Sequence, residues 1–315
     1  MFRLQVLESV DSTNEVIKRA IEDGEPEGLA IRAYRQTGGY GRQGRAWKSP
    51  RGGMYESILL RPKVEMRELP TLALVVAIAV RRALASLVVD DQARRIRIKW
   101  PNDVVLVGGD FGADYSTRDT ALELDGHTPR AVPHDENSPV GCSPKQDCLS
   151  TAYVRQAQGL QASQITTPSI KNLYSKLAGI SSEVHAGGIC VGIGVNVEPP
   201  EDAMEVGGKN APAYLADLGF GFTCEREAAI NAVGDAVLHE FEPLYRRWCD
   251  GGFAALSGEF AEHSMLEGRF VRMANQLGEV VCEGTVRGVD ASGRLLLRLE
   301  DGETKAVASG EVHLL

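Results

Sequence analysis

The sequence predicts an α+β fold that ends in a small all-β unit, and three patterns carry that prediction. A run that begins at Pro70, LPTLALVVAIAVRRALASL, is apolar over most of a helix circumference and predicts a buried core helix. Short apolar or alternating runs typical of strands occur on both sides of it. From Gly268 onward, short alternating runs are separated by turn signals at 292–293 and 301–302, which predicts the all-β unit.

Local signals predict the individual elements. Ser12 and Glu15 have the spacing of a capping box, which predicts a helix that starts there. Pro101 interrupts a strand pattern, which predicts a bulge or break that re-aims the side chains of Asn102 and Asp103. Strands are expected at 2–7, 29–34, 57–60, 95–99, 104–107 and 189–196, the last ending in a Gly-x-Gly turn, and helices at 12–21, 70–87 and 225–248.

The segment RQTGGYGRQGRAWKSPRGG, residues 35–53, concentrates flexible backbone and positive charge. It contains six glycines and five basic side chains, in a chain whose formal net charge is −9. Glycine lets the backbone approach a ligand closely, and Arg supplies planar, permanently charged donors. The segment is therefore predicted to be a mobile lid that closes on a small anion. The acidic balance of the chain argues against general binding of nucleic acid.

Composition divides the chain further. Five of the fourteen prolines fall within residues 109–171, where no apolar period is visible. This stretch is predicted to be a polar, largely irregular insertion, with one helix near 149–161. The predicted domains are 1–263, which contains the insertion, and 264–315.

The sequence carries no sign of a membrane or secretion segment. The longest apolar run, residues 72–80, is too short to span a bilayer, and the N-terminus lacks the apolar core of a signal peptide. The six cysteines show no CxxC spacing and are predicted to be free thiols in a reducing cytoplasm, with Cys142 and Cys148 a weak metal alternative.

Several short motifs occur in a fixed order along the chain. They are STN at 12–14, QTGGYGRQGRAW at 36–47, KWPND at 99–103, KLAGI at 176–180 and GIGVN at 192–196, followed by GTVRGVDASGRLLLRL and SGEVHL near the C-terminus. Together they resemble the biotin–protein ligase family, including the catalytic domain of the biotin repressor, over about residues 1–108 and 172–315. The resemblance implies a class II synthetase-like mixed sheet flanked by helices, followed by a small C-terminal β-barrel.

The resemblance also implies an activity and a site. ATP and Mg²⁺ would activate biotin to biotinyl-5′-adenylate, which then passes biotin to a lysine of a biotin carboxyl carrier domain. The implied biotin-binding residues are Ser12, Thr13, Asn14, Gln36, Gly39, Tyr40, Gly41, Arg42, Lys176 and Gly179. The implied ATP- and adenylate-binding residues are Arg42, Arg45, Trp47, Lys99, Trp100, Asn102, Asp103 and Asn196.

Charge considerations assign roles within that set. The biotin carboxylate must approach an α-phosphate of like charge, so cations have to neutralise both, and Lys176 and Arg42 are the catalytic candidates. Asp103 is the candidate Mg²⁺ ligand because Mg²⁺ prefers oxygen donors. Ser12, Thr13 and Asn14 at a helix start, with Gln36, can match the donors and acceptors of the ureido ring.

Two positions depart from the family pattern. Tyr40 stands where the motif often has its first Arg, so retention of the intermediate is in question. The insertion separates KWPND from KLAGI by about sixty residues more than is usual. The first strand begins too near Met1 to leave room for a helix-turn-helix, so operator binding is not expected.

Three other functions stay open on the sequence alone. The first is a lipoate or octanoate transferase of the same fold, which the GRGR-like loop and the SGEV ending disfavour. The second is a non-catalytic RNA-binding protein that uses its RGG-like loop, and the third is a member disabled by the insertion. The sequence does not decide which carboxylase would be modified, or whether the chain is a homodimer.

Overall fold

The computed structural model describes residues 2–108, 173–200, 211–221, 225–275 and 277–315. The insertion, the helix expected near 149–161 and the Cys142–Cys148 alternative lie outside these ranges. The main helices are α1 (Thr13–Glu22), α2 (Leu72–Ser86), α5 (Arg226–Gly251) and α6 (Ser257–His263). The strands are β1 (Arg3–Leu7), β2 (Leu29–Ala33), β3 (Gly53–Leu60), β4 (Ile96–Lys99), β5 (Asp103–Val107), β6 (Tyr174–His185), β7 (Gly188–Asn196), β8 (Phe270–Ala274), β9 (Val280–Val289), β10 (Leu295–Arg298), β11 (Thr304–Val307) and β12 (Glu311–Leu314).

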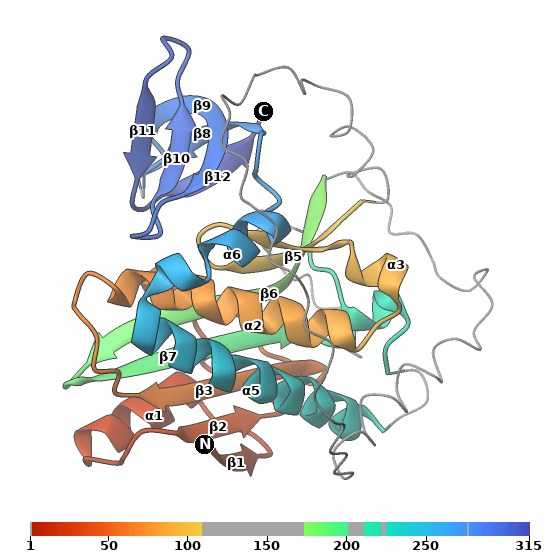
Figure 1. The fold of residues 1–315 in the computed structure, drawn as a ribbon. Helices are drawn as coiled ribbons and strands as arrows, with labels where there is room; N and C mark the ends of the chain where they lie inside the picture. The colour runs from red at the N-terminus through yellow and green to blue at the C-terminus, as the bar shows by residue number, and fades with distance from the viewer. Residues whose placement is uncertain (1, 109–172, 201–210, 222–224, 276) are drawn as a thin grey trace, which may run out of the picture.

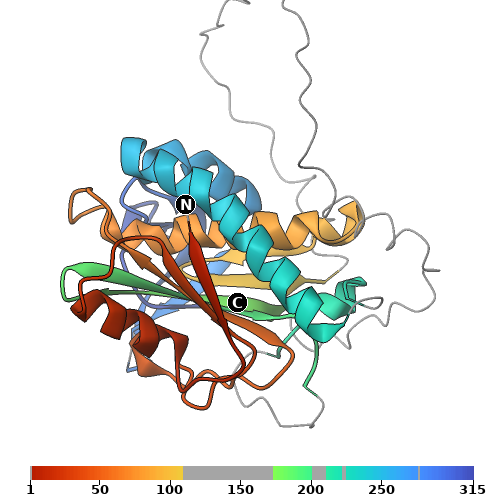
Figure 2. The same ribbon diagram turned by 90° about the horizontal axis from the view of Figure 1, so that it is seen from below.

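The central layer is a seven-stranded mixed sheet in the order β1-β2-β3-β7-β6-β5-β4. Strands β1 and β2 run parallel, and every other neighbouring pair is antiparallel. The predicted mixed sheet flanked by helices is confirmed. Helices α2 and α5 pack together over one face of this sheet, and α1 covers β2, β3 and β7 on the other face (Figures 1 and 2).

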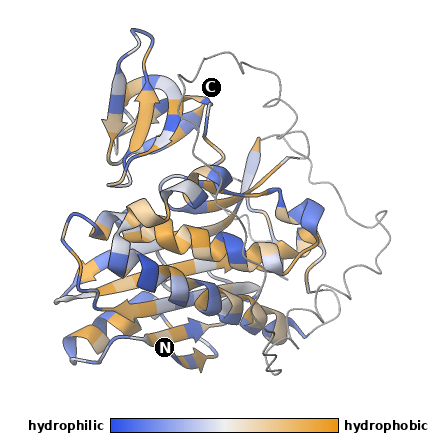
Figure 3. Cartoon of the chain, in the orientation of Figure 1, coloured by the Kyte–Doolittle hydropathy of each residue, from blue (hydrophilic) through white to orange (hydrophobic). Residues whose placement is uncertain are grey.

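The main core lies under α2. Apolar residues fill most of the circumference of this helix, and ten of its fifteen residues are buried. Figure 3 shows that α2 and the strands beneath it are mostly hydrophobic. Within the described residues, Leu69–Ser86 is long and apolar enough to cross a bilayer by length and composition, but 61% of that window is buried inside the fold. It is the core helix that the sequence predicts.

The C-terminal unit is a five-stranded antiparallel sheet in the order β11-β10-β9-β8-β12, where the sequence predicts a small β-barrel. Gly293 and Gly302 adopt positive φ values in the turns on either side of β10, as the turn signals predict. The sheet lies beside the β4–β5 hairpin of the larger one (Figure 1). Trp100, at the tip of that hairpin, donates a hydrogen bond from Nε1 to the Gly293 carbonyl at 2.9 Å.

Two local predictions are wrong. Gly192 and Gly194 do not form a turn, because they lie inside β7, where Gly192 pairs with Ser57 and Gly194 with Tyr55. Ser12 is the N-cap residue of α1, but its side chain makes no capping hydrogen bond. The capping box does not form because the Glu15 carboxylate accepts a hydrogen bond from elsewhere in the chain.

Candidate functional site

A cavity of about 820 Å³ lies between the start of α1, strands β6 and β7, the glycine- and arginine-rich segment 35–53 (the Gly/Arg loop) and the C-terminal unit. Fifteen of the residues predicted for the site line it: Thr13, Asn14, Gln36, Tyr40, Gly41, Arg42, Arg45, Trp47, Lys99, Trp100, Asn102, Asp103, Lys176, Gly179 and Asn196. Ser12 and Gly39, also predicted, are not part of the lining. Motifs that are far apart in the sequence therefore meet at one cavity.

One end of the cavity is a neutral hydrogen-bonding network at the start of α1. The backbone N–H and the Oγ1 hydroxyl of Thr13 both donate to Gln36 Oε1, at 2.8 and 3.0 Å. Gln36 Nε2 donates in turn to Ser49 Oγ at 2.9 Å. Ser57 Oγ lies 2.7 Å from both Thr13 Oγ1 and Asn14 Oδ1. These bonds fix buried donors and acceptors in one arrangement, as recognition of a polar, uncharged ring requires.

The two predicted residues outside the lining lie behind this network. The Ser12 side chain is buried, and its hydroxyl has no partner among the described residues. Gly39 is packed so closely that a Cβ there would lie 2.7 Å from Gln36 Nε2 and 2.8 Å from the Trp47 carbonyl. Gly39 thus allows the loop to approach the network, and its backbone does not face the cavity.

The Gly/Arg loop folds as a small hairpin over the cavity. The Gly41 N–H donates to the Arg45 carbonyl at 2.8 Å, and the Trp47 N–H donates to the Gly39 carbonyl at 2.9 Å. Between these bonds the chain turns through Gln43 and Gly44, which have φ values of 59° and 67°. The sequence predicts a mobile lid. In the structure the loop is closed over the cavity and internally hydrogen-bonded, and side chains on both of its halves contact the body of the protein, while its mobility stays a prediction.

Arg42 and Arg45 anchor the tip of this hairpin across the cavity. Arg42 donates to Asn102 Oδ1 at 3.0 Å, and Asn102 in turn donates from Nδ2 to the Ile180 carbonyl at 2.8 Å. Arg45 forms an ion pair with Glu311 of β12. Burial lowers the pKa of the Arg42 guanidinium, with Asp103 opposing that shift. The loop therefore contacts both the sheet and the C-terminal unit.

Trp47 occupies a slot made by two glycines of neighbouring strands. A Cβ on Gly179 would lie 2.9 Å from the Trp47 ring, and a Cβ on Gly194 would lie 2.9 Å from its Nε1 atom. Lys176 Nζ lies 4.9 Å from the ring centroid, within the range of a cation–π contact. A larger residue at position 179 or 194 would clash with the indole of Trp47. The glycine at 194 in the Gly-x-Gly pattern therefore makes room for this side chain.

The KWPND motif forms the tight connection between β4 and β5, with a cis Trp100–Pro101 peptide bond. Trp100 is only 1% exposed and bonds to Gly293, so its indole joins the two sheets as well as backing the cavity. Lys99 is buried, with Nζ 5.4 Å from the Tyr174 ring centroid, and burial lowers its pKa. Asn196 donates from Nδ2 to the Lys176 carbonyl at 3.0 Å.

Asp103 does not define a metal site by itself. Its Oδ1 atom lies 2.7 Å from Lys176 Nζ, so this carboxylate already has a cationic partner. Among the described residues, no group of three or more His, Cys, Asp or Glu side chains is placed to hold a metal. Mg²⁺ in phosphoryl-transfer sites is commonly held by one or two carboxylates together with the substrate phosphates. Asp103 fits that limited role.

The sequence did not predict a role in the site for four residues that support it, Ser49, Ser57, Glu15 and Lys18. Ser57 has a visible signal, since it is a polar residue at the head of the apolar strand run SILL. Glu15 and Lys18 lie on α1 at a spacing typical of an exposed helical ion pair. Their contacts with the loop are set by the tertiary fold.

Comparisons with known proteins agree with this geometry. Residues 6–112 match the biotin/lipoate A/B protein ligase family, and residues 268–315 match the biotin protein ligase C-terminal domain. The chain is 24% identical to the biotin–[acetyl-CoA-carboxylase] ligase of Mycobacterium tuberculosis over 99% of this chain and 89% of that protein. It is 23% identical to the bifunctional ligase/repressor BirA of Bacillus spizizenii over 97% of this chain and 72% of that protein.

Solved structures show the same fold. The biotin protein ligase from Aquifex aeolicus, in its complex with biotin and ATP, aligns with a TM-score of 0.64 and 23% identity. The alignment covers 100% of this chain and 99% of that one.

Proposed function

The chain belongs to the biotin protein ligase family, and we propose that it activates biotin with ATP and transfers the biotinyl group to a lysine of a biotin carboxyl carrier domain. One observation supports this proposal above the others. A single cavity joins a neutral hydrogen-bonding end, built from Thr13, Asn14 and Gln36, to a cationic end that contains Lys176 and Arg42. Biotin has the same polarity, with a ureido ring at one end and a carboxylate at the other.

In the first step, a carboxylate oxygen of biotin attacks the α-phosphorus of ATP, and the bond to the pyrophosphate leaving group breaks. Lys176 and Arg42 are placed to neutralise the two anionic groups, because they approach the same region from β6 and from the loop. Their partners hold them there in advance, Asp103 for Lys176 and Asn102 for Arg42. Cations fixed before the reaction lower the barrier without reorganisation.

In the second step, the lysine amine of the carrier attacks the carbonyl carbon of the adenylate. The amine gives up its proton, and AMP leaves with the electron pair of the broken carbon–oxygen bond. Before this attack the adenylate must be kept from water, which would hydrolyse it. The closed loop hairpin, with Trp47 inserted against β6 and β7, is suited to that exclusion.

We further assign residues 1–263 to the catalytic domain and 264–315 to the C-terminal domain. Contacts made by Arg45 and Trp100 suggest that the C-terminal unit helps to close the cavity. The acceptor is proposed to be the carrier domain of a biotin-dependent carboxylase.

The decisive experiment incubates the protein with ATP, biotin and a purified biotin carboxyl carrier domain. We expect pyrophosphate release that depends on biotin, and a mass gain of one biotinyl group on the carrier. A carrier with its target lysine changed to Arg is the control and should stay unmodified. Replacing biotin by lipoate tests the other activity of this fold. Transfer of lipoate without transfer of biotin would reject the proposal.

A further inference from the structure

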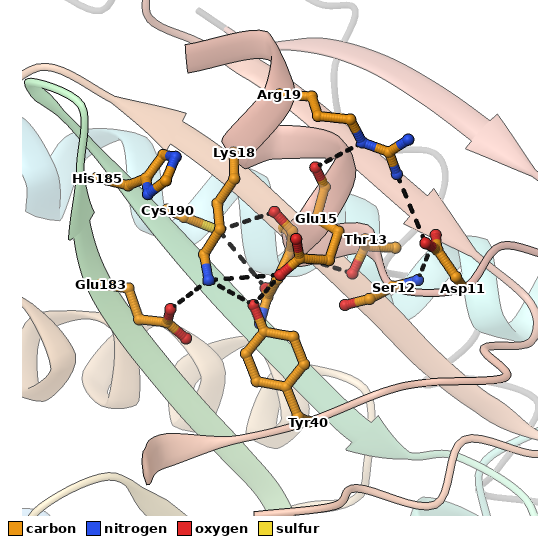
Figure 4. Close-up of polar contacts among 12 residues, drawn as sticks. Asp11, Ser12, Thr13, Glu15, Lys18, Arg19, Tyr40, Glu183, His185 and Cys190 are labelled. Atoms are coloured by element: carbon orange, nitrogen blue, oxygen red, sulfur yellow. Dashed lines mark hydrogen bonds and ion pairs between the residues drawn. The ribbon is translucent and has the colours of Figure 1, made fainter. Parts of the chain in front are cut away.

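Tyr40, the residue that departs from the family motif, lines the cavity and takes part in a four-residue polar cluster beside the start of α1 (Figure 4). Its hydroxyl lies 2.6 Å from Glu15 Oε1 and 2.7 Å from Lys18 Nζ. Lys18 Nζ is also 2.6 Å from Glu183 Oε2 of β6 and 5.1 Å from the centroid of the Tyr40 ring. We call Glu15, Lys18, Tyr40 and Glu183 the loop latch.

The chemistry of the partners fixes the proton of the Tyr40 hydroxyl. An ammonium group can only donate hydrogen bonds, and an ionised carboxylate can only accept them. The hydroxyl must therefore donate to Glu15 and accept from Lys18. Both bonds are charge-assisted, and the 2.6 Å separation is typical of an O–H···O⁻ bond. Phe at this position would make neither bond, and Arg could not accept the bond from Lys18.

The charge of the latch argues against a role in holding the substrate anion. It combines one ammonium with two carboxylates, so Lys18 is neutralised by Glu15 and Glu183. The side chain of Lys18 is 18% exposed, and its ammonium group already contacts Glu15, Glu183 and Tyr40. A negative cluster would repel an adenylate. The function of the latch must therefore concern the position of the loop.

Tyr40 lies in the first half of the loop hairpin, opposite Ala46. Arg42 and Trp47 follow on the same hairpin, and each is anchored at a different point of the cavity wall. The bonds of Tyr40 to α1, which Lys18 links to β6, thus hold the base of the hairpin, while Arg42 holds its tip. A loop that has lost the base contact can swing away from the cavity and take Arg42 with it.

We propose that Tyr40 is a positioning residue that latches the Gly/Arg loop over the cavity through Glu15, Lys18 and Glu183. The consequence for catalysis rests on the proposed function: the latch keeps biotinyl-adenylate in the site until the carrier arrives. Where the family motif often has an Arg, this chain has the neutral Tyr40, which holds the loop closed through hydrogen bonds.

Hydrogen exchange of the loop tests the latch without any substrate. In the full-length Tyr40→Phe variant, we expect the amides of Gly41 and Trp47, which close the hairpin, to exchange about tenfold faster. Tenfold corresponds to about 1.4 kcal/mol, the size of one charge-assisted hydrogen bond at a partly exposed site. The matched control is Tyr34→Phe, which removes a hydroxyl that accepts from Asn231 of α5 at 2.8 Å and takes no part in the loop latch. Its loop exchange should equal that of the wild type.

A double-mutant cycle separates the latch from a general loss of stability. Lys18→Met should also accelerate loop exchange, and Tyr40→Phe/Lys18→Met should exchange little faster than Tyr40→Phe alone, because Lys18→Met removes one of the two contacts that Tyr40→Phe already removes. Amides of β3 and β7 report global stability in every variant. Unchanged loop exchange in folded Tyr40→Phe, or fully additive effects in the double variant, would overturn the proposal. If Tyr40→Phe does not fold, unchanged loop exchange in Lys18→Met overturns it.

The catalytic consequence has its own readout. With ATP and biotin present, Tyr40→Phe should release several times more free adenylate per carrier modified than the wild type does. An unchanged ratio of release to transfer would reject the catalytic role of the latch. Absence of biotin-dependent turnover in the wild type would reject the proposed function. The hydrogen-exchange test of the loop latch would remain valid, because it uses no substrate.

Discussion

Replacing Gly194 by Ala should disable the loop without unfolding the protein. The new methyl carbon would lie 2.9 Å from Trp47 Nε1 and 3.0 Å from Trp47 Cε2. Carbon contacts are normally about 3.5 to 4.0 Å, so one partner must move by roughly half an ångström or more. The strand cannot move freely, since Gly194 is paired with Tyr55 on one side and with Gly179 on the other. The indole must therefore leave its slot.

The cost of this change follows from the contacts that Trp47 loses. Overpacking a filled site costs about 1–3 kcal/mol, which the protein avoids by expelling the indole. Expulsion loses the cation–π contact with Lys176, worth about 0.5–2 kcal/mol. The closed loop should therefore become less favourable by about 0.5–2 kcal/mol. That change lowers the rate of adenylation roughly 2- to 30-fold if only the closed loop reacts.

Biotin-dependent pyrophosphate release measures this effect directly. Gly258→Ala is the control, because Gly258 lies in helix α6 with no atom within 4 Å of the added Cβ. It should keep wild-type activity and equal or slightly higher thermal stability. Circular dichroism and the melting temperature show whether Gly194→Ala is folded. A folded Gly194→Ala protein that releases pyrophosphate at the wild-type rate would refute the proposed packing of Trp47.

Four other changes give distinct expected outcomes. Lys176→Ala should lower adenylation at least a hundredfold in a folded protein, because a cation that faces a transferring phosphoryl group is worth several kcal/mol, and pyrophosphate release measures it. Arg42→Ala should form adenylate more slowly and also lose it from the loosened loop, so free adenylate per transfer event, followed by chromatography, should rise. Burial raises the pKa of Glu56 to about 7 despite its 2.7 Å ion pair with Arg32, so the folded state holds a proton that the unfolded carboxyl loses near pH 4.5. The free energy of unfolding in urea should therefore fall by up to about 3 kcal/mol as pH rises from about 4.5 through 7, and Glu56→Gln should flatten that slope. Replacing residues 110–170 by an Asp-Gly turn should keep adenylation within about threefold of wild type and raise the melting temperature, because shortening a loop from about sixty residues to two gains roughly 3 kcal/mol at most.

The periodicity and motifs of the sequence determined most of the architecture and most of the site. Helix α2 followed from an apolar run after Pro70, and the C-terminal sheet followed from alternation with turns near Gly293 and Gly302. These features depend on neighbours a few residues away, which is the range that local patterns encode. The motifs, taken in order, resembled one family, and nearly all of the residues predicted from them line one cavity, while their roles in binding and catalysis stay predictions.

The tertiary structure alone decided what several of those residues do. The Gly-x-Gly of β7 looked like a turn, but its glycines make room for Asn14 and Trp47, which lie more than a hundred residues earlier in the chain. Trp100 looked like a ligand contact, yet it joins the hairpin to the C-terminal sheet. Tyr40 looked like a lost charge and proved to be bonded to α1. Each of these roles depends on which strands are neighbours and in which register, and local sequence periodicity carries no information about that pairing.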